Sequence, residues 1–274
     1  MQRLDAHCHF WRLDRRDYGW LQGPDPALDP IRRDFLPADH PAGGPVIAVQ
    51  AAPTLAETDF LLSLARREAQ ILGVVGWVDL AAPTAVADLA ARAAGPEFLG
   101  VRPMLQDIAA TDWLLTAPQG EALEALTRLQ LTFDALVTQR HLPVLARFAE
   151  QNPDLPIVID HAAKPQPGER GEWEVGMRRL AGQGLHCKLS GLLTELSPNE
   201  LRDPLAALRP LVAQLLDWFG ADRLIWGSDW PVLNLAASYA DWLALTGELL
   251  TDLSPDERAA VMGGNAMRFY GVTA

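Results

Sequence analysis

Short apolar runs alternate along the chain with longer segments of helical periodicity. Each run is rich in Val, Ile, Leu or Phe and is short enough for a buried strand. Strands that alternate with helices predict parallel βαβ units. The eight strand candidates are residues 4–10, 46–51, 74–80, 98–105, 131–137, 157–162, 186–192 and 224–230.

Helix starts are marked by Ser/Thr-x-x-Glu capping boxes, in which two side chains satisfy each other's backbone N–H groups. The boxes lie at Thr54–Glu57, Ser197–Glu200 and Ser254–Glu257. The second predicts a helix that begins beside Ser197 and ends at Gly220. Weaker helical patterns cover residues 119–130, 140–151, 172–182 and 238–250.

Eight βα units in about 250 residues match the size of a (β/α)8 TIM barrel. We therefore expect one α/β barrel domain over residues 1–274. An open doubly wound sheet is the rival, but no glycine-rich phosphate loop follows the first run. Residues 12–45 form a long connection, which predicts either a functional lid or a packed surface loop.

Composition excludes several classes of protein. The chain is 49% apolar, which is typical of a large core rather than of disorder, and it has only two cysteines, too few for a disulfide scaffold. A net charge of −12 without a basic cluster argues against nucleic acid and anionic lipid as partners. With neither a membrane span nor a secretory signal in the sequence, we expect a cytoplasmic protein, either monomer or homodimer.

Alternation along the first run separates its residues into two faces. Asp5, His7 and His9 share one face, which we expect inside the barrel, and the apolar residues 4, 6, 8 and 10 share the other. A barrel interior is normally filled by branched apolar side chains, so polar residues there need a reason. A His-x-His pair alone is more often structural, held by hydrogen bonds, than catalytic.

Residues on the later strands favour a catalytic role for His7 and His9 over a structural one. His161 is expected at the end of the sixth strand and Asp229 at the end of the eighth, which neighbours the first in a closed barrel. Further polar residues are expected at strand ends or inside the barrel: Gln50, Arg102, Asp134, Lys188 and Ser190. Each of these residues, taken alone, could have a structural role: Lys188 could be an ion-pair partner, and Arg102 could bind a loop carboxylate. Three histidines and an aspartate at one barrel end are not explained in this way.

Other reactive residues are assigned to structure. Asp160 has the wrong parity for the pocket, which predicts a residue that orients others or an acceptor facing the helices. Cys8 and Cys187 are expected to be small buried hydrophobes. His186 is expected to be structural, His40 and His141 to be solvated, and Trp77 to fill the core.

Four motifs in order along nearly the whole chain resemble the amidohydrolase-related family of the amidohydrolase superfamily. They are LDAHCHFW, VIDHAAKP, KLSG and LIWGSDWP, followed by a closing segment, GGNAMRFYG. The first and second are most similar to the sugar-lactone hydrolases, including fuconolactonases and rhamnonolactonases. The resemblance implies a (β/α)8 barrel with a hydrolytic site at its C-terminal mouth.

The family pattern carries over to His7, His9, His161 and Asp229. In metal-dependent relatives these positions bind the ion, so the same four residues would hold a divalent metal such as Zn²⁺ if one is bound. Such relatives usually add a His or a modified Lys on strand four or five, where this sequence has Arg102 and Asp134. We therefore expect that no metal is obligatory.

These residues predict a hydrolase that opens a sugar-derived lactone. Asp229 would act as general base toward water and then as general acid toward the ring oxygen, while the histidines polarise the carbonyl. Few cations are placed for a dicarboxylate, so a neutral polyhydroxy lactone is preferred. Expected substrate contacts are Gln50, Arg102, Lys164, Lys188, Trp20 and Trp230, with Ser190, Trp11 and Tyr18 as further candidates.

Alternative functions share the same barrel. A metal-dependent amidohydrolase or decarboxylase would need a tightly bound ion, and a hydrolase of carboxylated lactones would need more cations at the mouth. A binding protein without catalytic activity would not need the four mouth residues. The sequence leaves the sugar stereochemistry and the ring size of the lactone open.

Overall fold

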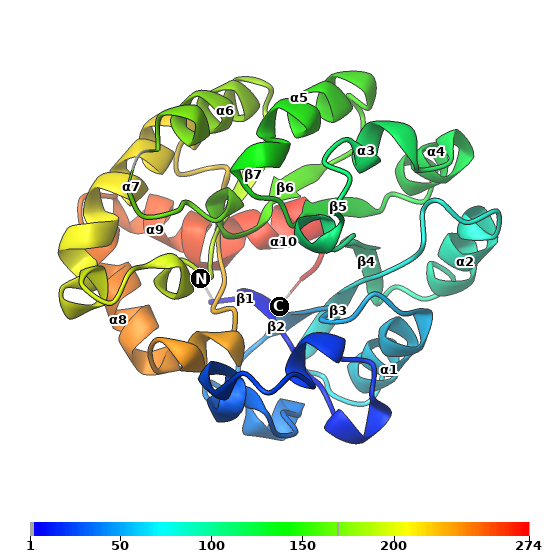
Figure 1. The fold of residues 1–274 in the computed structure, drawn as a ribbon, viewed down its shortest axis with the longest axis horizontal. Helices are drawn as coiled ribbons and strands as arrows, with labels where there is room; N and C mark the ends of the chain where they lie inside the picture. Colours follow the sequence, from blue (N-terminus) through cyan, green and yellow to red (C-terminus); the bar gives the residue numbers. More distant parts are fainter. Residues whose placement is uncertain (1–2, 169, 274) are drawn as a thin grey trace.

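The computed structural model describes residues 3–168 and 170–273, and it is a (β/α)8 barrel (Figure 1). Eight parallel strands follow each other around the sheet in sequence order. The barrel closes where Cys8 bridges Trp230 in parallel and the His9 N–H donates to the Trp230 carbonyl at 2.7 Å. The strands are Asp5–Cys8 (β1), Val46–Val49 (β2), Ile71–Gly76 (β3), Phe98–Val101 (β4), Thr132–Ala135 (β5), Ile157–Ile159 (β6), His186–Leu189 (β7) and Leu224–Trp226 (β8).

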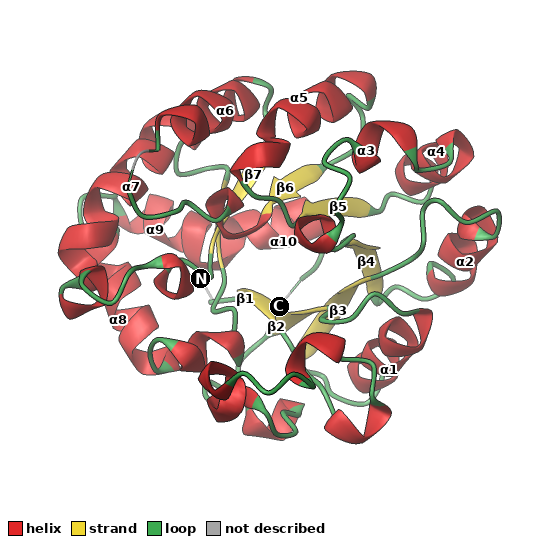
Figure 2. Ribbon diagram, viewed as in Figure 1, coloured by secondary structure: helices red, strands yellow, loops and turns green. Residues whose placement is uncertain are grey.

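Helices surround the strands, as the ring of helical segments in Figure 2 shows. Their amphipathic faces pack against the apolar outer surface of the barrel. The helices are Leu55–Ala65 (α1), Ala85–Arg92 (α2), Trp113–Thr116 (α3), Gly120–Arg128 (α4), Leu142–Gln151 (α5), Gly171–Gly182 (α6), Pro204–Phe219 (α7), Tyr239–Leu249 (α8), Pro255–Ala259 (α9) and Asn265–Tyr270 (α10). No helix among the described residues is long and apolar enough to span a membrane.

All eight expected strands are confirmed, but the structure shortens them. The strand expected over 74–80 begins three residues earlier, at Ile71, and ends at Gly76. Most of the extra residues of the expected ranges follow the last strand residue, in the loops at the C-terminal ends of the strands. These loops carry the polar groups of the barrel mouth.

Two of the three capping boxes cap a helix directly. Thr54 accepts from the Glu57 N–H before α1, and Ser254 does the same for Glu257 before α9. The expectation for Ser197 is wrong, because Ser197 and Glu200 enclose a local turn. The helix α7 begins only at Pro204, where the Asp203 carboxylate accepts from the Ala206 N–H at 3.0 Å.

The expected face of Asp5 is also wrong. Pairing of β1 with β2 shifts register between Asp5 and Cys8, and the shift reverses the faces of residues 4–6. The Asp5 carboxylate accepts from Ser228 N–H at 2.8 Å and contacts His40 Nε2 at 3.3 Å. Leu4 and Ala6 instead join the apolar cluster of Ile47, Val49, Val75 and Ile225.

The end of the barrel at the start of the strands is closed by the C-terminal segment. The Leu4 N–H donates to the Met262 carbonyl at 3.0 Å, just before α10. Ala266 and Tyr270 of α10 belong to the same apolar cluster as the inward residues of β2 and β8. This plug leaves the opposite end, where the strands terminate, available for chemistry.

Residues 12–45 are a packed segment built from short 3-10 turns (blue in Figure 1). Tyr18, Leu21, Ile31 and Phe35 are buried, and Trp11 forms an antiparallel bridge with Phe35. The aromatic contacts anchor the segment to the barrel mouth. Of the two expected roles, the structure therefore supports packing.

Candidate active site

Three histidines and one aspartate meet at the C-terminal mouth of the barrel. His7 and His9 stand on β1 and just beyond it, with ring centroids 5.0 Å apart, and the His7 and His161 rings are 4.5 Å apart. Asp229 Oδ1 lies 3.7 Å from His7 Nε2, 3.1 Å from His9 Nε2 and 3.8 Å from His161 Nε2. The expected convergence of these four residues is therefore present in the structure.

Asp229 lies three residues beyond β8 in a strained conformation. Its φ of 60° is in the left-handed region, which a non-glycine residue adopts only when its surroundings hold it there. Its N–H donates to the His7 carbonyl at 2.7 Å, which ties the residue to β1. Burial raises the pKa of Asp229, but attraction to His161, His9 and His7 outweighs it and holds the pKa well below the usual range. The carboxylate is thus ionised at neutral pH.

His161 reaches the same point through an unusual turn. The strand β6 ends at Ile159, and residues 161–164 all have positive φ values near 50–60°. His161 Nδ1 contacts the Ser190 hydroxyl at 2.9 Å, and burial lowers the pKa of His161 to about 4. The ring is therefore neutral at physiological pH.

Gly191 is a site residue that the sequence analysis missed. Its φ is 61°, and a Cβ there would lie 2.5 Å from His161 Nδ1 and 3.1 Å from Asp229 Oδ2. A side chain would collide with two of the four central groups, so only glycine fits. The KLSG motif contained this residue, but sequence gives no sign of the close approach.

A buried charge cluster lies beneath His7. Lys188 Nζ is 2.5 Å from Asp134 Oδ2, 3.1 Å from Asp160 Oδ1 and 3.0 Å from His7 Nδ1. The Tyr270 hydroxyl donates to the same Asp134 oxygen at 2.7 Å, and so connects α10 to the cluster. Lys188, Asp134 and Asp160 are completely buried.

Asp160 faces this cluster, so of its two expected roles the structure supports the one of orienting other residues and not the one of an acceptor facing the helices. Besides Lys188, it contacts His7 Nδ1 at 3.4 Å and Arg102 Nη1 at 3.5 Å. Burial raises the pKa of Asp160, but Lys188, His7 and Arg102 hold it well below the usual range. The left-handed turn that starts at His161 lets neighbouring residues 160 and 161 both reach the interior, which strict alternation forbids.

The cavity above these groups has a volume of about 260 Å³. Its lining includes His9, Arg102, His161, Lys164, Asp229 and Trp20, all expected near substrate. Met104, Gln106 and Leu136 line it as well and had no sequence signal.

Three expected substrate contacts do not line this cavity. Gln50 is buried and donates from Nε2 to the Arg102 carbonyl at 2.6 Å. Lys188 lies below the cavity in the charge cluster. Trp230 is 2% exposed and packs against Phe10 and Phe35. We therefore assign these three residues to supporting the site.

The remaining histidines and cysteines serve structure. His40 and His141 are buried, against the expectation that they are solvated: His40 pairs with Asp5, and His141 Nδ1 accepts from the Thr138 N–H at 3.1 Å. Cys8 and Cys187 are buried, as expected. Trp77, expected in the core, is only partly buried.

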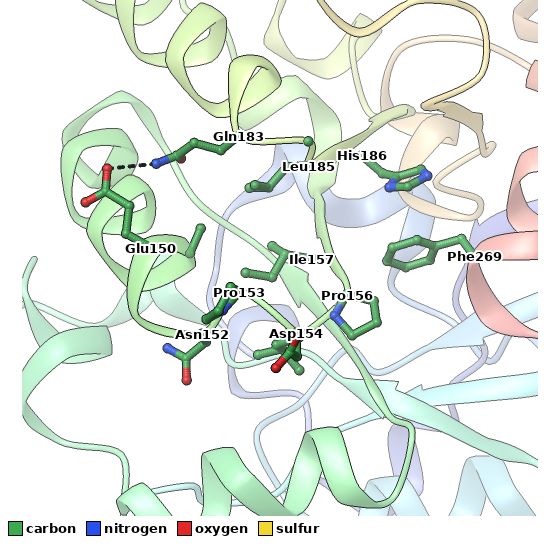
Figure 3. Close-up of a pocket in the computed structure, with 13 residues that line it drawn as sticks. Glu150, Asn152, Pro153, Asp154, Pro156, Ile157, Gln183, Leu185, His186 and Phe269 are labelled. Atoms are coloured by element: carbon green, nitrogen blue, oxygen red, sulfur yellow. Dashed lines mark hydrogen bonds between the residues drawn. The ribbon is translucent and has the colours of Figure 1, made fainter.

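A cavity of about 480 Å³ at the other end of the barrel is not the active site (Figure 3). It is lined by residues around the starts of β6 and β7, including His186, which packs against Phe269 with ring centroids 4.7 Å apart. The four central residues do not line it. This cavity is larger than the one above the four residues, but barrel enzymes place their chemistry where the strands end.

The donor atoms at the mouth fit one divalent metal. The groups His7–His9–Asp229 and His7–Asp160–His161 each present ligand atoms within 4.8 Å of one another. Both nitrogens of His9 face oxygen, Nδ1 at 2.8 Å from the Val49 carbonyl and Nε2 at 3.1 Å from Asp229. A neutral ring has one proton for these two acceptors, so a second proton or a cation must serve the other.

A second metal does not fit beside the first. Arg102 Nη1 lies 3.4 Å from His7 Nε2, and its Nη2 donates to the Gln50 carbonyl. The guanidinium cation thus lies next to His7, where its positive charge would repel a second divalent ion. This arrangement agrees with the sequence, which has Arg102 on strand four instead of a further metal ligand.

The fold and site together define a barrel of the hydrolase type, with a His/Asp centre at the mouth. Residues 4–272 match the model of the amidohydrolase family, and the chain belongs to that family. It is 46% identical to an L-fucono-1,5-lactonase of Burkholderia ambifaria, over 98% of this chain and 96% of the relative. An L-fucono-1,5-lactonase of Burkholderia multivorans is 38% identical, with the same coverage of each chain.

A solved structure extends the comparison to metal binding. The crystal structure of an amidohydrolase from Burkholderia multivorans with bound zinc is 37% identical and has a TM-score of 0.88, with all of both chains covered. The expected barrel and the expected family are therefore confirmed.

Proposed function

We propose that this chain hydrolyses a neutral sugar-derived lactone to the aldonic acid, and that L-fucono-1,5-lactone is the first substrate to test. The observation that carries the proposal is an ionised aspartate that lines a cavity of about 260 Å³ together with His9 and His161, and that also contacts the buried His7. That volume lies just below the range of about 300–1,000 Å³ for pockets that hold drug-sized ligands, so one small ring is the natural occupant. The two lactonase relatives support this choice.

Charge at the cavity favours a neutral lactone over a carboxylated one. The two cations of the lining are already engaged: Arg102 with Asp160, and Lys164 with Glu195 at 3.6 Å. A substrate carboxylate would have to compete with both acidic partners. Hydroxyl groups can accept from the same cations without displacing them.

Asp229 is the proposed general base and acid. It removes a proton from water as the water oxygen adds to the lactone carbonyl carbon, and it returns the proton to the ring oxygen when the ester C–O bond breaks. Its lowered pKa makes it a weak base at rest, because His161, His9 and His7 stabilise the anion. When these histidines turn their donors to the carbonyl oxygen, that stabilisation weakens and the basicity of Asp229 rises.

The proposed metal site is His7, His9 and Asp229, with His161 beside it. A divalent metal such as Zn²⁺, when bound there, polarises the carbonyl and lowers the pKa of water. We propose that no metal is obligatory, since Arg102 and Lys188 already place two positive charges next to His7. Retained activity after chelation and verified metal removal is the expected result, whereas complete loss that zinc restores would favour a metal-dependent amidohydrolase or decarboxylase.

The test is proton release, followed with a pH indicator, on a panel of neutral 1,4- and 1,5-lactones and one carboxylated lactone. We expect turnover of a neutral lactone and a fall in kcat of about 10²–10⁴ for Asp229→Asn. Asp154→Asn is the matched control, because Asp154 lines the cavity at the other barrel end. Near-normal kcat in Asp229→Asn removes this residue as the base, and turnover of the carboxylated lactone alone removes the proposed substrate class.

A further inference from the structure

A larger cavity of about 550 Å³ adjoins the catalytic cavity. The two have three lining residues in common: Trp20, Met104 and Asp107. The two cavities therefore lie side by side at the barrel mouth, on either side of these side chains. Its other lining residues come from segment 12–45, the loops after β2, β3 and β4, and the start of α3.

Three indole rings line this second cavity: Trp20, Trp77 and Trp113. Trp20 is 37% exposed although its Nε1–H donates to the Ala51 carbonyl at 2.9 Å, so a fixed ring is left open to solvent. Trp77 and Trp113 are only partly buried. Rigid aromatic faces at the edge of a polar site provide large contact area for the apolar C–H face of a sugar ring.

The charged residues of this cavity are all acidic. Asp17, Asp79 and Asp107 line it, and none of the described lining residues is a Lys, Arg or His. Carboxylates accept hydrogen bonds from sugar hydroxyls, but they repel phosphate and carboxylate groups. The chemistry thus selects a neutral, hydroxyl-rich ligand.

We propose that this aromatic cavity is a subsite for a neutral sugar ring joined to the lactone. The chain would then open glycosylated sugar lactones more efficiently than the parent monosaccharide lactone. This inference rests on the proposed lactone hydrolysis and adds a substrate class to it. The catalytic cavity holds the lactone ring, and the larger neighbouring cavity holds the glycosyl group.

The test compares three kinds of substrate that share one lactone ring: the parent, its glycosylated derivatives from 1→3- and 1→4-linked disaccharides, and the matching uronyl derivatives. We expect at least one neutral glycosylated lactone to have a lower KM than the parent, and uronyl derivatives to gain nothing. Trp113→Leu, which retains apolar bulk, and Trp113→Ala should raise the KM of that substrate about 2- to 12-fold. Their kcat/KM for the parent should stay within twofold, because Trp113 does not line the catalytic cavity.

Trp218→Leu is the matched control, since Trp218 lies on α7 and packs against Trp173. The inference is overturned if the parent is hydrolysed while glycosylation never lowers KM, or if Trp113 variants affect both substrates equally. Failure to hydrolyse any substrate overturns the proposed function as well. Hydrolysis of a glycosylated lactone without hydrolysis of the parent supports both.

Discussion

Replacing Lys188 by Met should cost the protein about 3–5 kcal/mol of unfolding free energy, which is typical when one partner of a buried ion pair is removed. The ammonium group is completely buried and lies 2.5 Å from Asp134 and 3.1 Å from Asp160. At an effective dielectric constant near 20, the two contacts contribute about 7 and about 5 kcal/mol of Coulomb attraction. The Lys188→Met variant regains the cost of desolvating the ammonium but leaves the carboxylates buried without it.

This loss should depend on pH in a defined direction. Burial raises the pKa of Asp134, and Lys188 opposes that rise. Without Lys188, the folded state binds protons at the two carboxylates more strongly than the unfolded state does. Stability of the variant should therefore fall as pH rises above about 4, so that its deficit is larger at pH 8 than at pH 5.

Urea unfolding at pH 5 and pH 8 measures both effects, and thermal unfolding should show a decrease of about 6–20 °C in Tm. Lys164→Met is the matched control, because its ion pair with Glu195 is partly exposed and should contribute less than about 1 kcal/mol. The double variant Lys188→Met/Asp134→Asn should lose less than the sum of the single variants. A loss below about 1 kcal/mol for Lys188→Met, or a loss independent of pH, would refute the reasoning.

Two further predictions concern titration outside the catalytic centre. Burial raises the pKa of Glu57 to about 8, so the folded state binds this proton more tightly than the unfolded state, and stability falls as pH rises from 4.5 to 8. The Glu57→Gln side chain can still accept from the Ala51 N–H. In urea unfolding this variant should be more stable than the unmodified protein at pH 8.5 and nearly equal to it at pH 4.5. Burial lowers the pKa of His186 to about 4, so the unfolded state binds more protons between pH 4 and 6.5, and stability decreases as pH falls through that range. The His186→Gln variant should show a weaker dependence of stability on pH. An unchanged slope of unfolding free energy against pH would contradict this prediction.

The barrel was predictable because its evidence is local and repeated. Each strand candidate is a short apolar run, and capping boxes or helical periodicity separate many of them. The misplaced elements depended on longer-range contacts. Asp203 rather than Ser197 caps α7, and the register shift in β1 turns Asp5 toward His40. The short helices α2, α3 and α10 were not expected, since each spans too few residues for a clear periodic pattern.

The central residues of the site were predictable for a similar reason. His7, His9, His161 and Asp229 follow apolar strand residues, and parallel strands bring such ends together. Their supporting contacts were not predictable. The pairing of Tyr270 with Asp134 joins positions 136 residues apart, and the left-handed turn after Asp160 breaks the alternation on which the faces were assigned.

These supporting contacts determine how the central residues can act. Both ring nitrogens of His7 face a cation that can only donate: Lys188 Nζ lies 3.0 Å from Nδ1, and Arg102 Nη1 lies 3.4 Å from Nε2. Burial and the charge of Lys188 lower the pKa of His7 well below its usual range, so this ring is neutral beside the two cations. A divalent cation held by His7 Nε2 would lie beside the Arg102 guanidinium and near the buried Lys188 ammonium, and both charges would repel it. The buried lysine thus opposes a further cation at His7, which favours metal-independent hydrolysis, and Lys188→Met should increase zinc affinity.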